Sequence, residues 1–237
     1  MFYVYFKYNS KEKAARKKMK KCLCIYGNSG VGRELVYLLT AKKMLKKWDR
    51  LVFINDLSYG TTTMGHSVIS FEESITLHNL FDCEYIIAVG EPALRKKLYE
   101  KLQKNHLAIT SINGSDYVLS DSSAIGIGSI LHLSSVVTIE TAIGHNCFIN
   151  KGVIIGHNVS IGDHSVLSPH VTVGGYSKIG ESTYIGSGAV IRDKITIGNH
   201  CIIGMGAVVT KDVNDNEVVV GNPAKHLRYN TAEKVFK

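Results

Sequence analysis

The sequence predicts a chain of two parts, a small α/β domain followed by an all-β parallel β-helix of hexapeptide repeats. Two observations support this prediction. Over residues 21–112, short apolar segments alternate with amphipathic ones, which is typical of a small parallel sheet covered by helices. Over residues 125–209, an aliphatic residue recurs at every sixth position without a gap. A sustained period of six is the repeat of a β-helix coil.

The six-residue period predicts a prism in which three units make one coil of eighteen residues. Inward aliphatic side chains then stack on their equivalents in the next coil. Glycine usually follows each of them, and we expect it to supply unusual backbone geometry at the turn. Four places on, a small residue fits the narrow interior. A period of six does not keep residues on one stripe of an α-helix. The aliphatic positions are Ile125, Leu131, Val137, Ile143, Ile149, Ile155, Ile161, Leu167, Val173, Ile179, Ile185, Ile191, Ile197, Ile203 and Val209.

The net charge of +8 is concentrated at the start of the chain. Residues 1–21 hold eight Lys or Arg against one Glu, which leaves 20 basic against 19 acidic residues in the remainder. A nearly neutral remainder removes the main argument for a nucleic-acid partner. We expect residues 1–20 to form a disordered basic tail, because an apolar start followed by basic residues reverses the order of a signal peptide.

Composition also predicts the compartment. No run of 18 apolar residues exists, so we expect no membrane span. The five cysteines are an odd number without a C-x-x-C pair. Cys22, Cys24, Cys147 and Cys201 fall at apolar or small inward positions, as in a reduced, cytoplasmic protein.

The α/β domain begins with a predicted strand at Cys22, a glycine turn and an amphipathic helix. The apolar stripe of this helix is formed by Leu35, Leu38, Leu39 and Leu45. A second strand ends at Asp56, a third surrounds Val68, and a fourth covers residues 84–90. A helix with Pro92 in its first turn follows, and then a last strand in LAITSI ends near Ile112. This order predicts a Rossmann-like domain.

The glycine turn suggests an anion site. Gly27, Gly30 and Gly32 have the order G-x-x-G-x-G, which differs from the dinucleotide fingerprint, so NAD is only weakly indicated. Backbone N–H groups at a helix start still favour an anion. Asp56 follows the second strand, where a carboxylate can hold ribose hydroxyls, and Gly90 closes the fourth strand on the same rim. We infer a nucleotide or nucleotide-linked ligand, with tight turns and a capping Asp as the alternative.

Six histidines lie in the repeats (132, 145, 157, 164, 170 and 200), and we expect most of them to be solvated corner residues. His157 differs because Gly175 lies eighteen residues further, and therefore beside it on the next coil. A base next to an exposed glycine N–H suits acyl transfer, since one takes a proton from the nucleophile and the other binds the thioester oxygen. Spacing alone leaves a plain corner histidine as the alternative.

Several motifs over residues 21–226 carry a resemblance to a known family. They are IYGNSGVGRE, FIND, AVGEPALRKKLYEKL, IGDHSVLSPHVTVGG, IGSGAVI, IGMGAVVTKDV and VGNPAK. The chain resembles the hexapeptide-repeat sugar acetyltransferases of the sialic acid O-acetyltransferase type, whose relatives N-acetylate UDP-linked 4-amino sugars in the bacillosamine and perosamine routes. This resemblance implies a homotrimer of left-handed β-helices that acetylate bacterial surface sugars, with active sites between neighbouring prisms.

The resemblance also implies roles for particular residues. His157 would be the general base for direct attack of the acceptor on acetyl-CoA, without a metal. Gly175 would offer its amide to the thioester, and Asn150 would help place the acceptor. The remaining implied contacts form two groups. They are Ser29, Gly30, Asn55, Asp56 and Gly90 for the nucleotide sugar, and Ser187, Met205 and Gly206 for the pantetheine arm of acetyl-CoA.

Two positions depart from the family. Many relatives follow the histidine with Asp or Glu, where this chain has Asn158. An amide fixes the ring tautomer without adding charge, so the histidine is less basic or takes its carboxylate from elsewhere. Nine residues after the base, relatives often have a second histidine, where this chain has Val166. These departures affect the expected acceptor and efficiency, and leave the fold prediction unchanged.

We therefore expect four segments and one leading function. The segments are a basic tail (1–20), a nucleotide-sugar-binding domain (21–112), an acetyltransferase β-helix (113–213) and a C-terminal cap (214–237). The alternatives are a non-catalytic nucleotide-sugar-binding or scaffold solenoid and, less favoured, a zinc enzyme like γ-carbonic anhydrase with three histidine ligands.

Overall fold

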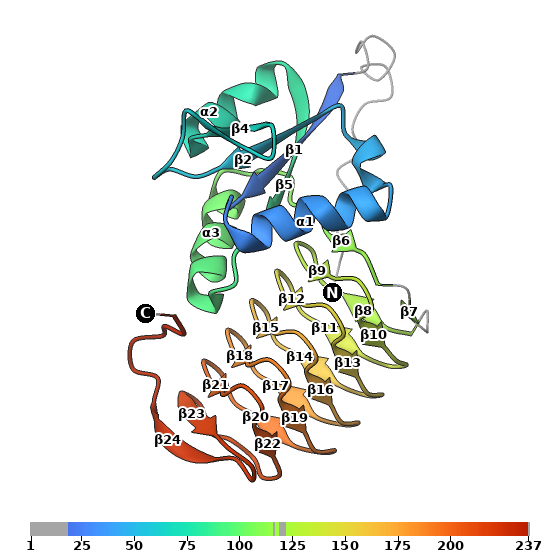
Figure 1. Cartoon of the computed structure of the whole chain (residues 1–237), viewed down its shortest axis with the longest axis vertical. Coiled ribbons are helices and arrows are strands. Elements are labelled where there is room, and N and C mark those ends of the chain that lie inside the picture. Colours follow the sequence, from blue (N-terminus) through green and yellow to red (C-terminus); the bar gives the residue numbers. More distant parts are fainter. Residues whose placement is uncertain (1–18, 116, 119–121, 237) are drawn as a thin grey trace, which may run out of the picture.

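The computed structural model describes residues 19–115, 117–118 and 122–236. Nearly all of the predicted basic tail lies outside these residues. The described chain consists of an α/β domain stacked on a three-sided prism (Figure 1). Two expected parts are therefore present in the expected order.

The α/β domain contains a five-stranded sheet with the order β3-β4-β2-β1-β5. All neighbours are parallel except β3 and β4, which form an antiparallel pair that the sequence analysis did not predict. The expected last strand in LAITSI is wrong: Ile109 makes a single bridge to Tyr85, and Ile112 already belongs to the prism. The strands are β1 (Lys20–Tyr26), β2 (Arg50–Ile54), β3 (Thr61–Thr63), β4 (His66–Ile69) and β5 (Phe81–Ile87).

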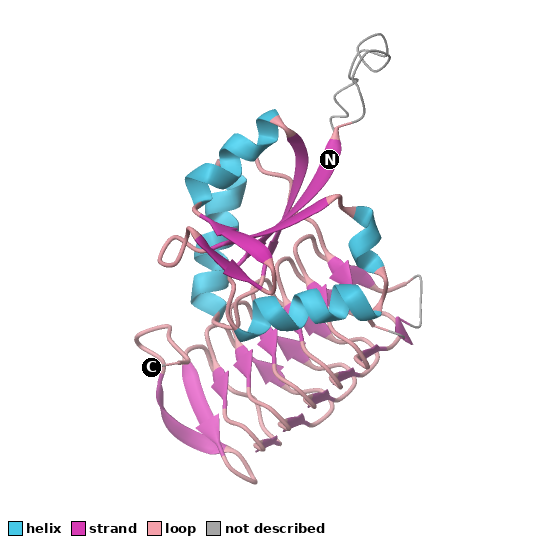
Figure 2. Ribbon diagram, turned by 45° about the horizontal axis from the view of Figure 1, so that its top comes forward, coloured by secondary structure: helices cyan, strands magenta, loops and turns pink. Residues whose placement is uncertain are grey.

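Helices cover both faces of this sheet (Figure 2). The helix α1 packs Leu35, Leu38 and Leu39 between the sheet and the prism. Leu45 lies beyond the end of α1, because Lys43 adopts a left-handed φ of 55°. The opposite face is covered by α2 and α3. The helices are α1 (Gly30–Ala41), η2 (Met44–Lys47), α2 (Phe71–Thr76), η3 (Leu77–Asn79) and α3 (Pro92–Lys104).

The prism has three faces, and over residues 124–209 neighbouring strands on each face pair in parallel at a spacing of eighteen residues, as in Phe148 with Val166. The first face packs against the α/β domain and holds β6 (Ile112–Asn113), β9 (Ile130–Leu131), β12 (Phe148–Ile149), β15 (Val166–Leu167), β18 (Tyr184–Ile185), β21 (Ile202–Ile203), β23 (Glu217–Val220) and β24 (Lys225–Tyr229).

The second face is formed by the strands that follow the first-face strands in each coil. Its strands are β7 (Tyr117–Val118), β10 (Val136–Val137), β13 (Ile154–Ile155), β16 (Thr172–Val173), β19 (Val190–Ile191) and β22 (Val208–Val209). The third face holds β8 (Ala124–Ile125), β11 (Ala142–Ile143), β14 (Ser160–Ile161), β17 (Lys178–Ile179) and β20 (Thr196–Ile197).

The inward positions form one continuous apolar core, and the small residues at the plus-four positions, such as Ser165 and Cys201, are fully buried. The expected role of the repeat glycines is wrong, because Gly156 and Gly162 do not have positive φ. The left-handed residues come two places later, as at Asn158 (58°) and His164 (62°). Glycine is required for space, since a Cβ on Gly162 would lie 2.5 Å from the Glu181 nitrogen of the next coil.

Arg95 joins the two parts of the chain. It is fully buried on α3, and its guanidinium donates to the carbonyl oxygens of Ile87 and Val89 in the α/β domain. It also donates to the carbonyl and side-chain oxygens of Asn146 in the prism, at 2.8 and 2.9 Å. This network fixes the carboxyl end of β5 against the first coils.

The C-terminal segment extends the prism and returns to the α/β domain. β23 pairs with β21 and then with β24, while Val219 packs on the end of the prism core. Further on, the amides of Val235 and Phe236 donate to the Glu91 carboxylate at the start of α3. Within the described ranges, no helix has the length and apolar character needed to cross a bilayer.

Candidate active site

His157 lies on the prism corner between the second and third faces. Its side chain is exposed in the turn that joins β13 to β14. The ring of Tyr176, from the next coil, packs edge-on against the imidazole at 4.9 Å between centroids. We call this edge of the prism the His157 corner. Its equivalent positions on successive coils are Ile139, His157, Gly175 and Asp193.

A hydrogen-bond relay orients His157. Its Nδ1 lies 2.9 Å from Asn158 Oδ1, and Asn158 Nδ2 donates to Glu140 Oε2 at 2.5 Å. Because a carboxylate only accepts, the amide must turn its NH₂ toward Glu140 and its oxygen toward the ring. Nδ1 is then the donor, which leaves the Nε2 lone pair free to accept a proton. Glu140 thus supplies the carboxylate of the relay, and the side-chain amide of Asn158 connects it to the imidazole of His157.

Gly175 lies directly beside the imidazole, as the spacing predicts. A Cβ on Gly175 would be 2.8 Å from His157 Nε2. A residue larger than glycine therefore fits here only if the imidazole moves. The expectation of an exposed Gly175 N–H is wrong for this structure. The amide is buried and donates to Asp193 Oδ1 at 2.6 Å, so a thioester oxygen would have to displace that carboxylate.

The other prism histidines do not share one environment. His145 and His170 are exposed, as expected of corner residues, but His132 and His164 are buried. Burial lowers the pKa of both buried histidines, which favours the neutral imidazole. In the part of the chain that the structure describes, the group with metal-ligand spacing is Cys22, Cys24 and Cys83, far from these histidines in sequence.

The predicted nucleotide rim forms a cavity of about 340 Å³ at the carboxyl ends of β1 and β2. It brings together Ser29, Asn55 and Asp56 with Gly27 of the predicted glycine turn and with Asn28, which was not predicted as a contact. Gly90 follows Val89, which lines the cavity, and Gly30 lies on the other side of the turn. Asn55 donates to Asn28 at 2.7 Å and so positions the turn before α1.

Asp56 has more structural contacts than the sequence indicates. It accepts from the Tyr26 hydroxyl at 2.8 Å and from the Phe71 amide at 2.7 Å, and Lys101 lies 3.4 Å away. Burial would raise the pKa of Asp56, but the Phe71 amide, the Tyr26 hydroxyl and Lys101 together lower it. Asp56 therefore presents an ionised carboxylate that is already held in place.

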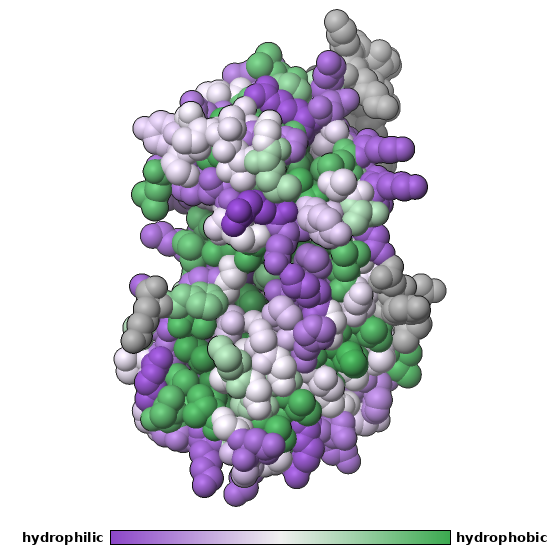
Figure 3. All heavy atoms as spheres, viewed as in Figure 1, coloured by the Kyte–Doolittle hydropathy of each residue, from purple (hydrophilic) through white to green (hydrophobic). Residues whose placement is uncertain are grey.

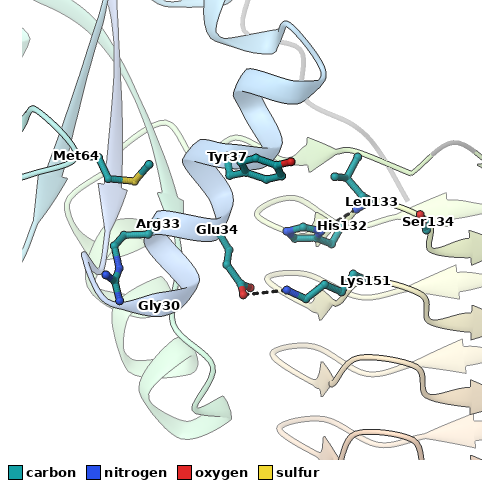
Figure 4. A pocket seen from close by; sticks show the side chains of 9 residues that line it. All are labelled: Gly30, Arg33, Glu34, Tyr37, Met64, His132, Leu133, Ser134 and Lys151. Atoms are coloured by element: carbon teal, nitrogen blue, oxygen red, sulfur yellow. Dashed lines mark hydrogen bonds and ion pairs between the residues drawn. The ribbon is translucent and has the colours of Figure 1, made fainter.

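A larger cavity, of about 780 Å³, lies between α1 and the prism (Figure 4). Lys151 crosses its edge and forms an ion pair with Glu34 at 2.8 Å. The turn at Gly30 separates it from the smaller cavity. The residues that line it are Gly30, Arg33, Glu34, Tyr37, Met64, His132, Leu133, Ser134 and Lys151.

The residues expected to contact acetyl-CoA do not all lie on one corner. Ser187 and Met205 are exposed on the corner between the first and second faces, and the Gly206 amide donates to the Ser187 carbonyl at 2.9 Å. Asn150 is at the upper end of the same edge, where its Oδ1 accepts from the Lys151 amide. We call this edge the Lys151 corner. Its equivalent positions are Leu133, Lys151, Pro169, Ser187 and Met205.

Within one chain, the second face separates the His157 corner from the Lys151 corner. The outward side of this face carries a row of mostly aliphatic residues, of which Ile154 and Val190 are 47% and 41% exposed. Hydrophobic residues also reach the surface of the prism in several groups on the face seen in Figure 3. The row consists of Val136, Ile154, Thr172, Val190 and Val208.

Val166 is part of the apolar core between the prism and the α/β domain. It is buried on β15 and packs with Leu23 of β1 and Phe148 of β12, where the prism meets the α/β domain. A histidine here would place a polar ring between the two parts of the chain. The departure at this position is therefore explained by packing.

Three residues that the structure brings to these sites had no role predicted for them from the sequence. Glu140 lies eighteen residues before Asn158, Asp193 eighteen after Gly175, and His132 eighteen before Asn150. The same spacing that placed Gly175 beside His157 identifies all three as neighbours. The eighteen-residue spacing is therefore a signal in the sequence for all three residues.

Comparison with known proteins agrees with this two-part organisation. Residues 22–102 match the family described as PglD N-terminal domain, and residues 140–175 and 176–211 match bacterial transferase hexapeptide repeats. No curated protein matches the chain.

Solved structures resemble the chain over most of its length. WeeI from Acinetobacter baumannii AYE is 31% identical, with 87% of this chain and 100% of that chain covered and a TM-score of 0.76. The acetyltransferase domain of PglB from Neisseria gonorrhoeae FA1090 is 27% identical, with coverage of 87% and 99% and a TM-score of 0.78. A variant of perosamine N-acetyltransferase from Caulobacter crescentus, in complex with CoA and GDP-perosamine, is 24% identical, with coverage of 87% and 96% and a TM-score of 0.78, and so supports the fold.

These similarities confirm the predicted fold class, an α/β domain followed by a hexapeptide-repeat β-helix. The chain is an acyltransferase and belongs to the family of hexapeptide-repeat sugar acetyltransferases with a PglD-type N-terminal domain.

Proposed function

We propose that the protein transfers the acetyl group of acetyl-CoA to an amine or hydroxyl of a nucleotide-linked surface sugar, with His157 as the general base. The observation that supports this most directly is the relay from Glu140 through Asn158 to His157. It fixes the one tautomer in which Nε2 accepts a proton, at an exposed position beside Gly175.

The reaction would proceed by direct attack. As the acceptor nitrogen or oxygen forms its bond to the thioester carbonyl carbon, Nε2 removes its proton. The tetrahedral intermediate then collapses, the C–S bond breaks, and the CoA sulfur leaves with a proton that the imidazolium can return. No protein nucleophile is required. The PglB acetyltransferase domain has also been solved in complex with acetyl coenzyme A, and it is 26% identical to this chain with a TM-score of 0.58.

The smaller cavity supports a nucleotide-linked acceptor. Gly27, Asn28 and Ser29 precede α1, whose first-turn N–H groups have no partner within the helix and favour a phosphate. The ionised carboxylate of Asp56 lies at the end of β2, where ribose hydroxyls are commonly held. We place the reaction in the cytoplasm, where five buried free thiols remain reduced.

We further propose that each active site combines two chains of a homotrimer. His157 and Gly175 lie on one corner of the prism, whereas Asn150 and Ser187 lie on another, with the second face between them. The exposed aliphatic row on that face would be covered by a neighbouring copy. A neighbour placed there would bring its His157 corner toward the Lys151 corner of this chain, which would complete the site.

The role of His157 is tested by a His157→Ala variant assayed for release of CoA thiol with acetyl-CoA and a panel of UDP-, CMP- and GDP-linked amino sugars. A general base contributes about 10²–10⁴-fold, so the rate should fall by at least a hundredfold. His145→Ala is the matched control, because His145 is also an exposed corner histidine but lies on a different corner. A loss of less than threefold in His157→Ala would disprove the assignment.

The same panel tests the non-catalytic alternative. Binding of CoA and of a nucleotide sugar by calorimetry, with no acetyl transfer to any of them, would favour a scaffold solenoid over the enzyme.

A further inference from the structure

His132 lines the larger cavity and contains a buried polar atom without a hydrogen-bond partner in the described ranges. The side chain is 4% exposed, and its Nε2 has no hydrogen-bond partner among the residues that the structure describes. Figure 4 shows the ring extending from the prism turn toward α1. A buried polar atom without a partner is uncommon in folded proteins and calls for a ligand or another explanation.

The hydrogen bond at the other ring nitrogen identifies the missing partner as an acceptor. The Leu133 amide donates to His132 Nδ1 at 2.9 Å, so Nδ1 carries no proton. The neutral ring, which burial favours, then holds its proton on Nε2. The Glu34 backbone carbonyl of α1 is close enough to raise the pKa of the His132 imidazole, but its geometry with Nε2 falls outside that of a hydrogen bond. His132 therefore offers one unused N–H.

The walls of the cavity suit a sugar ring. Tyr37 of α1 and Met64 of the β3–β4 turn are 65% and 52% exposed, and each offers apolar surface. The Glu34–Lys151 ion pair and Arg33 supply charged groups around it. A pyranose presents both an apolar ring face and hydroxyl oxygens that accept hydrogen bonds, which matches an aromatic wall with a single buried donor.

The two cavities lie on either side of the start of α1. Ser29 lines the smaller one, and the next residue, Gly30, lines the larger one. The side chain of Ser29 makes no capping hydrogen bond within the described chain, so the helix start is open to an anion. A nucleoside in the smaller cavity with its diphosphate at this helix start would place the attached sugar in the larger cavity.

We propose that this cavity holds the sugar ring of the nucleotide-linked acceptor and that His132 Nε2–H donates to one of its hydroxyl or acetamido oxygens. The proposal rests on the proposed function and deepens it, because it assigns to His132 a role in recognition of the sugar. His132 lies one coil above Asn150, on the edge that we assign to acceptor placement.

The test is calorimetry without acetyl-CoA, so that it does not depend on acetyl transfer. The probes are UDP, GDP, UDP-N-acetylglucosamine, GDP-mannose and GDP-perosamine. The quantity compared is the ratio of the Kd of the nucleoside diphosphate to the Kd of its nucleotide sugar, which we call the sugar gain. His132→Leu removes the donor with little change of volume, whereas His132→Gln keeps an N–H near the position of Nε2.

We expect His132→Leu to reduce the sugar gain by about tenfold, as for one neutral hydrogen bond, and to leave the affinity for the nucleoside diphosphate unchanged. His132→Gln should keep the gain within about threefold of wild type. An unchanged gain in His132→Leu, an equal loss for the nucleoside diphosphate, or a wild-type protein in which no sugar adds affinity would overturn the proposal. His157→Ala should lose transfer but keep the sugar gain, which separates failure of this proposal from failure of the proposed function.

Discussion

Gly175→Ala tests whether the space beside His157 is part of the catalytic geometry. The added Cβ would lie 2.8 Å from Nε2 and 2.9 Å from Cε1 of His157. An ordinary contact between such atoms requires about 3.5 Å, so the ring must withdraw by roughly 0.5–1 Å. The φ of Gly175 lies outside the left-handed region, so alanine introduces this clash without backbone strain.

The expected result is a large loss of rate with little loss of stability. Misplacement of a reacting group by about 1 Å costs on the order of a hundredfold, so kcat should fall by about that factor in the thiol-release assay. The exposed imidazole can move into solvent, so Tm should change by less than about 2 °C.

A double-mutant cycle with His157→Ala provides the control. Without the imidazole there is nothing for the added methyl group to displace, so Gly175→Ala should add little further loss in that background. Fully additive losses, or a Gly175→Ala enzyme that retains more than about a third of wild-type kcat, would refute the reasoning.

Three further outcomes follow from the structure. Asn158→Ala should lower kcat about fivefold with little effect on KM, because it removes a hydrogen bond worth about 1 kcal/mol that orients His157. Kinetics that match wild type would contradict the relay. Arg95→Met should cost more than about 3 kcal/mol, seen as a Tm lower by more than about 6 °C, because it leaves several buried carbonyls unpaired between the two parts of the chain. The pKa of Asp56 is lowered by folding, so its stabilisation is present above about pH 4 and lost as pH falls further. Urea unfolding should therefore show wild type more stable than Asp56→Asn at pH 7, with the difference shrinking as the pH falls below about 4.

The repeat region was the most predictable part of the chain. Its core depends on a strict sequence period, so the inward positions, the small residues and the proximity of His157 to Gly175 all follow from counting residues. The role of the repeat glycines was not predictable in the same way. Left-handed φ values occur at Asn158 and His164, because an Asx or other polar residue tolerates this geometry at the turn, while glycine is needed where coils approach closely.

The site was less predictable than the fold because its contacts run between coils and between domains. The amide of Gly175 is paired with Asp193, and Asn158 reaches Glu140, through side chains whose directions a sequence does not show. The burial of His132 depends on the way α1 packs across the prism. Short elements such as β3 and α2 were missed because they have too few residues for a periodic pattern.

The central claim is that acetyl transfer takes place at a site built from two chains, with the His157 corner of one and the Lys151 corner of the other. The most direct measurement is the activity of mixed trimers from co-expression of His157→Ala with Ser187→Trp, where the indole blocks the exposed path along the Lys151 corner. Each variant alone should be inactive. In random mixtures, about one site in four joins two intact corners, so about a quarter of wild-type activity should return. If no activity returns above that of the separate variants, the two corners do not meet across a subunit interface and the claim is contradicted.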